Sequence, residues 1–428
     1  CLLLTAYCFL GTMPTIHPFG GLRYNPERIK DLSDVLAPPY DVIDAAAQER
    51  LYQASPHNIV RLILGKPSPT DTPEQTWHTR AARDFAAWRT EGILRADPTP
   101  AIYLIAQTFG RDARCRLGVI ALMDLRHDLN GMVYRHEATL DAPKQDRTRL
   151  LEAIPANLSP IFCVYPDQGA ATHTLLQEAT RAAPTVTASM NGETIRMWMI
   201  TDSRTIQAVT QALAAGAVLI ADGHHRFEVA YAKRDRYPVL MTYFVSMEDP
   251  ALVVQPIHRV IRQPLSLERL RRFCAIEPVR VHDLALLAWW LEAPEGQGRF
   301  GVWDGDQLYK VTLQPEPLAR WLMAPSVPRL IATLDVSLLH QLLVPQLYDA
   351  APTIDYTADA STALPRLNGK TDGSLWLLRP IPLPQVYALA AQGLTLPPKS
   401  TYFYPKVPSG LVLNPLASCI IASGLGLR

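Results

Sequence analysis

Two adjacent histidines and an arginine in the middle of the chain form its clearest chemical motif. They are His224, His225 and Arg226. An arginine side chain grips a phosphate through two parallel hydrogen bonds, and a histidine moves a proton near neutral pH. Side chains of these types at consecutive positions predict an anion site at which acid–base chemistry takes place.

The residues in front of the histidines predict the elements that position them. Ala217–Ala221 is a short apolar run of the kind found in buried strands. Asp222 and Gly223 suit a tight turn, and apolar residues at three- and four-residue steps after His224 predict a helix with one buried face. A helix N-terminus presents backbone N–H groups and a partial positive charge, so Asp222–Arg226 is the predicted phosphate site.

A structural interpretation of the same residues stays open. In that interpretation the two histidines cap the helix, and Arg226 pairs with Asp222 or Glu228. The combination of an apolar strand, an Asp-Gly turn, paired histidines and an arginine favours the functional interpretation over the structural one.

A second group of polar residues lies in Tyr134–Arg147, which reads YRHEATLDAPKQDR. Glu137 is a candidate general base or magnesium ligand. Lys144 and Arg147 are candidates to neutralise phosphate oxygens, because the transition state of phosphoryl transfer carries charge on those oxygens. The alternative is a solvated cluster with local ion pairs.

A proline turn at Pro38-Pro39 precedes Tyr40 and Asp41. A rigid turn aims side chains at a site with little loss of entropy on binding, so Asp41 is a candidate catalytic carboxylate. The alternative is that Asp41 caps the helix predicted directly after it.

The segment PPKSTYFYPK near the C-terminus combines two lysines with hydroxyls and aromatic rings. Lys399 and Lys406 are candidates to cover a nucleotide, and the three consecutive aromatic residues suit either that role or ordinary core packing. Stacking on single-stranded nucleic acid is a further, weaker interpretation of this patch.

Strands that alternate with helices predict a mixed α/β (α+β) fold. We expect residues 1–12 to be a leader outside the native protein, 13–262 a catalytic or nucleotide-binding region, 263–365 a supporting α/β domain, 366–416 a segment returning to the site, and 417–428 a tail. Expected strands include His57–Gly65, Ile102–Phe109, Cys115–Met123, Ile161–Val164, Arg196–Thr201, Pro238–Met247 and Ala251–Ile261, and expected helices include Thr76–Thr90, Asp146–Ala153 and Thr205–Ala215.

The composition is that of a globular protein with a large core. The 428 residues carry a net charge of +1, so bulk electrostatics do not favour DNA binding. Six scattered cysteines form no Cys-x-x-Cys pair, which favours reduced thiols and a cytoplasmic location. The apolar first ten residues are too short to span a membrane; a mis-set start explains them, with a truncated signal peptide as the alternative.

The motif DGHHRFEVA resembles the central motif of the bacterial and archaeal family called domain of unknown function 1015. Further blocks resemble that family in order: His17–Asp44, Ser55–Gly65, Tyr134–Phe162 and Pro397–Leu416. The Asp-Gly-His-His-Arg element is in turn similar, over a shorter stretch, to the phosphate-binding signature of the ParB/sulfiredoxin superfamily. This resemblance implies a ParB/sulfiredoxin-like core around the strand–turn–helix site.

Members of that superfamily include free-serine kinases, nucleotide hydrolases and DNA-segregation proteins. The resemblance and the predicted anion site together favour nucleotide-dependent phosphoryl transfer to the hydroxyl of a small metabolite, possible acceptors including serine, with Mg²⁺ and ATP or ADP. His224 or His225 would act as acid or base, and Asp41 or Glu137 would activate the acceptor or hold magnesium.

Three alternatives remain open from the sequence. One is a phosphatase or nucleotide hydrolase that uses the same site with water as the acceptor. Another is a ParB-like, nucleotide-gated DNA-binding protein. The last is a metal-dependent hydrolase with Asp222, His136 and the paired histidines as ligands, which adjacent histidines disfavour. The oligomeric state and the metal are not predicted.

Overall fold

The computed structural model describes residues 14–214, 216–280, 287, 290–291, 297–323, 328–364, 367 and 369–416. The predicted leader and tail lie outside these residues. The chain divides into two units: the first comprises 1–135, 139–252 and 405–428, and the second comprises 136–138 and 253–404. The division between residues 252 and 253 precedes the boundary that we predicted after residue 262, and residues 405–416 fall in the first unit.

The first unit is built on a nine-stranded sheet in the order β6-β11-β8-β12-β5-β4-β10-β9, with β1 also pairing β5. Pairs β11/β6 and β12/β8 are parallel, and the other neighbours are antiparallel. The strands are β1 (Ile16–His17), β4 (Ile102–Phe109), β5 (Arg114–Asp124), β6 (Val133–Tyr134), β8 (Ile161–Tyr165), β9 (Val186–Met190), β10 (Glu193–Ile200), β11 (Val218–Asp222) and β12 (Val239–Ser246).

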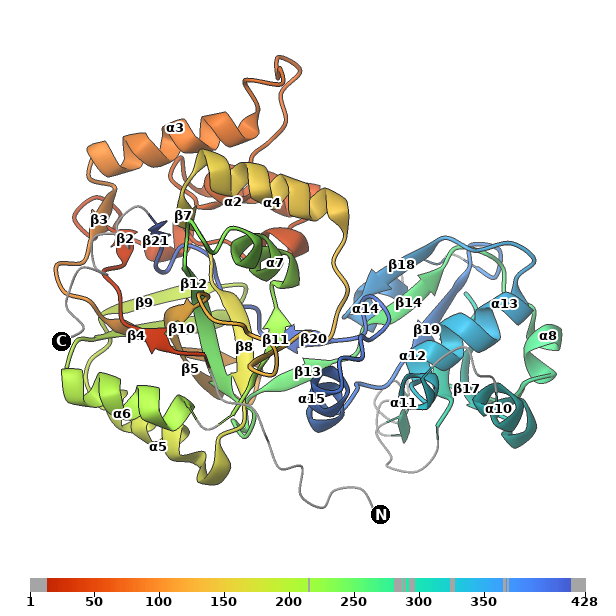
Figure 1. Ribbon diagram of the computed structural model, residues 1–428. Coiled ribbons are helices and arrows are strands. Elements are labelled where there is room, and N and C mark those ends of the chain that lie inside the picture. The colour runs from red at the N-terminus through yellow and green to blue at the C-terminus, as the bar shows by residue number, and fades with distance from the viewer. Residues whose placement is uncertain are drawn as a thin grey trace. The chain divides into compact units, whose positions relative to one another are not determined.

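Helices cover both sides of this sheet. In Figure 1, α5 and α6 lie together on one side of it, and α3 and α4 lie on the other. The helices of the unit are α1 (Ala45–Ala54), α2 (Val60–Ile63), α3 (Trp77–Thr90), α4 (Asp141–Ala153), α5 (Ala171–Ala179), α6 (Ser203–Leu213) and α7 (His224–Ala232); two small sheets pair β2 (Leu22–Tyr24) with β3 (Leu94–Ala96) and β7 (Ala156–Asn157) with β21 (Asn414–Pro415).

The predicted central strand is confirmed as β11, and every one of its residues is buried. It lies between β6, which pairs with its first two residues, and β8. A strand that is buried on both faces reads as a continuous apolar run rather than an alternating one, which explains the composition of Ala217–Ala221. The mixed α/β class is confirmed as well.

The strand that we predicted over His57–Gly65 is wrong, because the structure has the short helix α2 there. Asn58 decides the local conformation: its Oδ1 accepts from the Val60 N–H at 2.9 Å, and its Nδ2 donates to the carbonyls of Asp34 and Leu36. The apolar residues of α2 are buried in the core that α1, α3 and α4 share. Tertiary packing therefore overrides their β-branched propensity.

The single strand predicted over Ala251–Ile261 is two strands. They are β13 (Val253–Gln255) and β14 (His258–Ile261), and they belong to different sheets. Pro256 stands between them and has no N–H to donate to a ladder, so pairing stops there.

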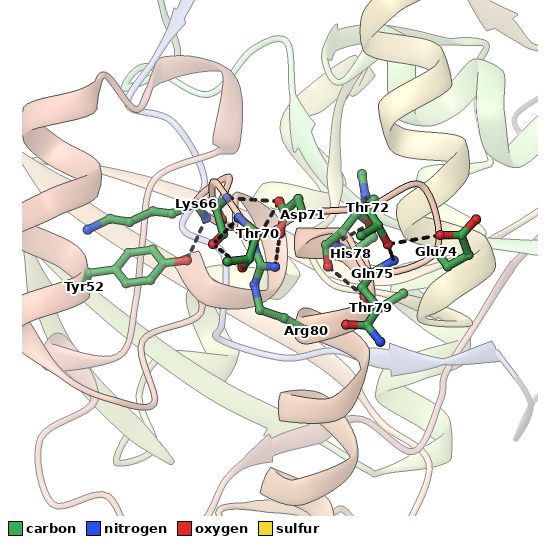
Figure 2. Close-up of polar contacts among 12 residues, drawn as sticks. Tyr52, Lys66, Thr70, Asp71, Thr72, Glu74, Gln75, His78, Thr79 and Arg80 are labelled. Atoms are coloured by element: carbon green, nitrogen blue, oxygen red, sulfur yellow. Dashed lines mark hydrogen bonds and ion pairs between the residues drawn. The ribbon is translucent and has the colours of Figure 1, made fainter.

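Figure 2 shows how the polar loop after α2 is tied to α3. Arg80 of α3 donates to the carbonyl oxygen of Lys66 at 2.7 Å and pairs with Asp71. Thr76, which precedes α3, accepts from the His78 N–H at 3.3 Å and caps the helix. These hydrogen bonds tie the loop between α2 and α3 to the first turns of α3.

The second unit contains a six-stranded antiparallel sheet in the order β15-β17-β16-β19-β14-β18, and β13 pairs with β20. The strands are β14, β15 (Cys274–Val279), β16 (Arg299–Trp303), β17 (Leu308–Leu313), β18 (Ile354–Thr357), β19 (Ser374–Leu377) and β20 (Tyr402–Tyr404). The helices are α8 (Leu267–Arg271), α10 (Pro315–Leu322), α11 (Arg329–Ala332), α12 (Asp335–Ser337), a π-helical turn (Leu338–Leu343), α13 (Val344–Leu347), α14 (Ala360–Ala363) and α15 (Leu383–Ala391).

Two histidines, the buried His258 and the half-buried His340, make the stability of the second unit depend on pH. Burial and the neighbouring Arg259 lower the pKa of His258 and of His340 from 6.5 to about 4. The unfolded chain takes up these protons at a higher pH than the folded unit, so their stabilisation is complete above pH 6.5 and is lost as the pH falls toward 4.

We expect His340→Gln to reduce the proton uptake on unfolding by about one proton between those pH values, since glutamine still accepts a hydrogen bond but does not titrate. Urea denaturation across this pH range measures the slope of the unfolding free energy against pH, which reports the proton uptake. The same substitution at the exposed His127 is the control. An unchanged slope in His340→Gln would contradict the assignment.

Candidate functional site

The turn between β11 and α7 requires the glycine that the motif supplies. Gly223 has φ +94°, and a Cβ there would lie 2.9 Å from the Ile161 Cγ2 atom. Side chains larger than hydrogen are therefore both strained and crowded at this position. Helix α7 begins at once, with the Phe227 N–H donating to the Gly223 carbonyl at 2.9 Å. The predicted strand–turn–helix is confirmed, with the helix N-terminus directly beyond the strand.

Asp222, the last residue of β11, is held between two cations. Arg226 donates from Nη2 to one carboxylate oxygen at 2.9 Å, and Lys406 Nζ contacts the other. The three side chains are each about one tenth exposed, at 9 %, 12 % and 11 % for Asp222, Arg226 and Lys406. Burial works to raise the pKa of Asp222, but Lys406 and Arg226 outweigh it and hold that pKa below 3.8. Asp222 is therefore a carboxylate.

Arg226 also reaches away from Asp222. Its Nη1 donates to Ser159 Oγ at 2.9 Å and to the carbonyl oxygen of Pro160 at 2.5 Å. Glu228 pairs with Arg135 instead of with Arg226, at 2.8 Å. The pairing of Arg226 with Asp222, one of the two structural alternatives, is thus present. Two cationic side chains, Arg226 and Lys406, therefore contact one carboxylate at the start of α7.

The two histidines differ in environment. His225 Nε2 accepts the backbone N–H of Leu140 at 3.0 Å, and Leu140 precedes α4. An accepting ring nitrogen carries no proton, so this contact fits a neutral imidazole with its proton on Nδ1. His225 thus caps the neighbouring helix rather than its own. His224 is buried and lies within electrostatic range of Asp222.

Helix α4 brings Arg147 to the same unit, and it begins five residues before the predicted start, at Asp141 rather than Asp146. Arg147 is buried, donates to the Ile63 carbonyl at 2.8 Å, and lies 4.0 Å from the centre of the Tyr40 ring. Lys144 pairs with Asp141 at 3.0 Å.

Asp41 is exposed in a 3-10 helix, Tyr40–Val42. The capping alternative for Asp41 is wrong, because Asp44 is the residue that caps α1, accepting from Ala47 at 2.7 Å. The adjacent Tyr40 ring connects this loop to the motif. Its pKa is raised by burial and pulled back by the charges of Arg147 and Arg226. Asp41 is therefore adjacent in the chain to a tyrosine whose pKa responds to the charges of both arginines.

Arg147 and Arg226 line one cavity of about 70 Å³, together with Asn157 and Ser159. This volume exceeds that of a single water and suits a phosphate-sized group rather than a whole nucleotide. Sequence reasoning missed Asn157 and Ser159, whereas Tyr40 lies in the proline-turn loop whose side chains we predicted to point at a site. A signal was present for Asn157 and Ser159, since both lie within a block that resembles the family.

Glu137 and Lys399 belong to the second unit. The Lys399 N–H donates to Glu137 Oε1 at 3.3 Å. The structure thus brings these two predicted residues together. It brings Asp222, Arg226 and Lys406 together in the first unit, with His224 and His225 adjacent to them in the chain.

No group of three or more histidine, cysteine, aspartate or glutamate side chains within the described ranges forms a metal site. Magnesium needs only one or two carboxylates when substrate phosphates supply its other ligands, and Asp41 has that chemistry. Among the helices of the described residues, none is long and apolar enough to cross a membrane.

The fold and the site define a mixed α/β protein in which a strand, a glycine turn and a helix N-terminus bring together Asp222, the nearby Arg226 and the distant Lys406. The chain belongs to the family described as protein of unknown function (DUF1015), whose model matches residues 16–337. The Pro397–Leu416 block lies beyond the matched range. No curated protein matches the chain.

Three solved structures are similar to the chain at low identity. C-terminally truncated SbnI from Staphylococcus aureus has a TM-score of 0.36 and 12 % identity, covering 69 % of this chain and 87 % of its own. A free serine kinase mutant in complex with ADP has 0.35 and 12 %, covering 66 % and 87 %. A conserved hypothetical protein from Pyrococcus furiosus has 0.34 and 13 %, covering 70 % and 96 %. Because these TM-scores are below 0.5, the functional argument rests on the geometry of the site.

The charge balance around Asp222 generates a prediction. Lys406→Met removes one of its two cations, and we expect the free energy of unfolding to fall by about 1–3 kcal/mol at pH 7. Since the pKa of Asp222 is lowered in the folded state, this stabilisation is present above its unfolded pKa of 3.8. It is lost as the pH falls through the folded value, so the difference between wild type and variant should shrink in acid.

Denaturation of the double variant Asp222→Asn/Lys406→Met closes a thermodynamic cycle, and its cost should be smaller than the sum of the single costs. Lys233→Met, which breaks only an exposed pair with Glu152, is the matched control with an expected cost below about 1 kcal/mol. Strictly additive costs would contradict coupling between Asp222 and Lys406.

Proposed function

We propose that the protein transfers a phosphoryl group from a nucleotide, ATP or ADP, to the hydroxyl of a small metabolite. The observation that carries the proposal is the convergence of Arg226 and Lys406 on Asp222 at the N-terminus of α7. Fixed cations and helix N–H groups at one point are what a phosphate chain requires.

In this proposal the phosphates bind at Asp222–Arg226, and the cavity between Arg147 and Arg226 takes one phosphate-sized group. Asp222 keeps Arg226 and Lys406 in place before the nucleotide arrives, so little reorganisation is needed on binding. Lys144 of α4, which pairs with the exposed Asp141, is a further cation of the first unit.

The reaction forms a bond between the acceptor oxygen and the transferred phosphorus and breaks the bond from that phosphorus to the nucleotide oxygen. The acceptor proton goes to a base, for which Asp41 is our first candidate because it is an exposed carboxylate next to Tyr40. His224 protonates the departing oxygen. Mg²⁺, when bound, spreads the developing charge over the phosphate oxygens.

A thermal-shift panel tests the phosphate site directly. ATP, ADP, CTP, pyrophosphate and phosphate are compared with and without Mg²⁺, and a ligand of the folded state raises the midpoint. We expect a nucleotide to shift the wild type and Arg226→Ala to weaken its binding at least about ten-fold, since a charge-assisted contact contributes 1.5–3 kcal/mol. Arg181→Ala, at an exposed arginine, should bind as the wild type does. No shift by any nucleotide would sink the proposal.

Product analysis separates transfer from hydrolysis. Phosphorus NMR with serine as the first acceptor should show a phosphate ester, whereas free phosphate alone would establish the hydrolase alternative. We expect Asp41→Asn to lower kcat by a factor of about 10²–10⁴ while nucleotide binding is retained. An unchanged kcat in Asp41→Asn would rule out Asp41 as the base.

A further inference from the structure

The second unit contains a cavity that the proposed phosphoryl transfer does not use. Its volume is about 480 Å³, within the usual range of small-molecule sites. Most of its wall is apolar, and Leu334, Val336 and Ile381 are among the lining residues. Polar groups at the wall include Gln385 and one arginine that is far more buried than arginines usually are.

That arginine is Arg259 of β14, which is 1 % exposed. In the sheet it lies between Tyr356 of β18 and Trp376 of β19, which are its partners in register. The guanidinium lies 5.0 Å from the centre of the Tyr356 ring. Because β14 lies between β18 and β19, the sheet fixes the position of Arg259 in the cavity wall.

The groups that accept hydrogen bonds from the Arg259 guanidinium are uncharged. It donates from Nε to His340 Nε2 at 2.9 Å, from Nη1 to the Ile257 carbonyl, and from Nη2 to the Pro398 carbonyl at 3.5 Å. His340 accepts here and has a pKa of about 4, so it is uncharged at neutral pH. A guanidinium has five N–H donors, and these contacts use three of them.

Charge compensation is missing at Arg259. Within the described part of the chain, no carboxylate oxygen lies within 4.0 Å of its guanidinium nitrogens. Burial lowers the pKa of Arg259 to about 10, which still leaves it protonated at neutral pH. A buried charge is costly unless it is paired, so an unpaired arginine facing a cavity calls for an anion.

The other arginine of the cavity is already neutralised. Arg379 donates from Nε to Asp335 Oδ2 at 2.6 Å, and the second oxygen of Asp335 accepts from the Gly298 N–H at 2.8 Å. The described ionisable residues of the wall therefore leave one positive charge, that of Arg259. A single charge in an apolar cavity matches a monoanion better than a doubly charged phosphate.

We propose that this cavity binds a small organic carboxylate, with the carboxylate on Arg259 and an apolar body against Leu334, Val336 and Ile381. The remaining donors of the guanidinium bind the two carboxylate oxygens. Gln385 supplies a side-chain amide to a polar substituent on the body of the ligand. The site is independent of the phosphate site, since its residues all lie in the second unit.

Isothermal titration of the full chain with propionate, hexanoate, benzoate and phenylalanine, and with inorganic phosphate for comparison, tests the site at pH 7.5. We expect at least one carboxylate to bind at or below about 1 mM and phosphate not to bind there. Arg259→Gln should weaken the carboxylate at least about ten-fold. Val336→Phe, which fills the cavity and keeps the arginine, should weaken it as well.

Arg262→Gln is the control, because it removes an arginine from an exposed pair with Asp355 just beyond β14. It should bind as the wild type does. If Arg259→Gln does not fold, Val336→Phe alone decides. Absence of carboxylate binding, wild-type affinity in both cavity variants, or preference for phosphate over every carboxylate in the Arg226→Ala background would overturn the proposal. Arg226→Ala, which disables the phosphate site, should leave carboxylate affinity unchanged and so separates the two proposals.

Discussion

The carboxylate of Asp222 and its two cations are the interaction on which the first unit depends. Arg226 comes from the next turn of the chain, but Lys406 comes from a segment 184 residues later. A buried carboxylate is unfavourable unless it is paired, so the return of the C-terminal segment stabilises the end of β11. This one contact thus links the strand, the helix N-terminus and the end of the chain, and it assembles positive charge where phosphates would bind.

The scaffold around this contact explains its rigidity. β11 is buried along its whole length between two neighbouring strands, and Gly223 allows α7 to start immediately beyond it. The Nη1 group of Arg226 donates to Ser159 and to the Pro160 carbonyl, so contacts other than that with Asp222 also fix its guanidinium. Charged groups that are fixed before a ligand arrives stabilise developing charge more than mobile ones do.

The two units handle buried charge in opposite ways. In the first unit, two cations contact the single negative charge of Asp222, and the pKa of Asp222 is lowered. In the second unit, Arg259 meets neutral acceptors within the described residues, and burial lowers its pKa. Both arrangements leave net positive charge next to a cavity. The apolar wall in the second unit and the helix terminus in the first favour different anions, which is why we assign them different ligands.

The sequence by itself determined the local elements of the site. An apolar run, an Asp-Gly turn and a three-to-four periodicity specify β11 and α7, because strand burial, turn geometry and helix amphipathicity are all properties of neighbouring residues. The family followed from the same motif and its companion blocks. The mixed α/β class followed from the alternation of strands and helices, and its expected ParB-like core stays a prediction.

Tertiary structure decided everything that depends on distant partners. The helix at Val60–Ile63 forms because Asn58 bonds to carbonyls of another segment and because three helices bury its apolar residues. The pairing of Lys406 with Asp222 and the unpaired charge of Arg259 have no local signature. Such contacts depend on which segments the fold brings together, and a pattern read along the chain carries no information on that.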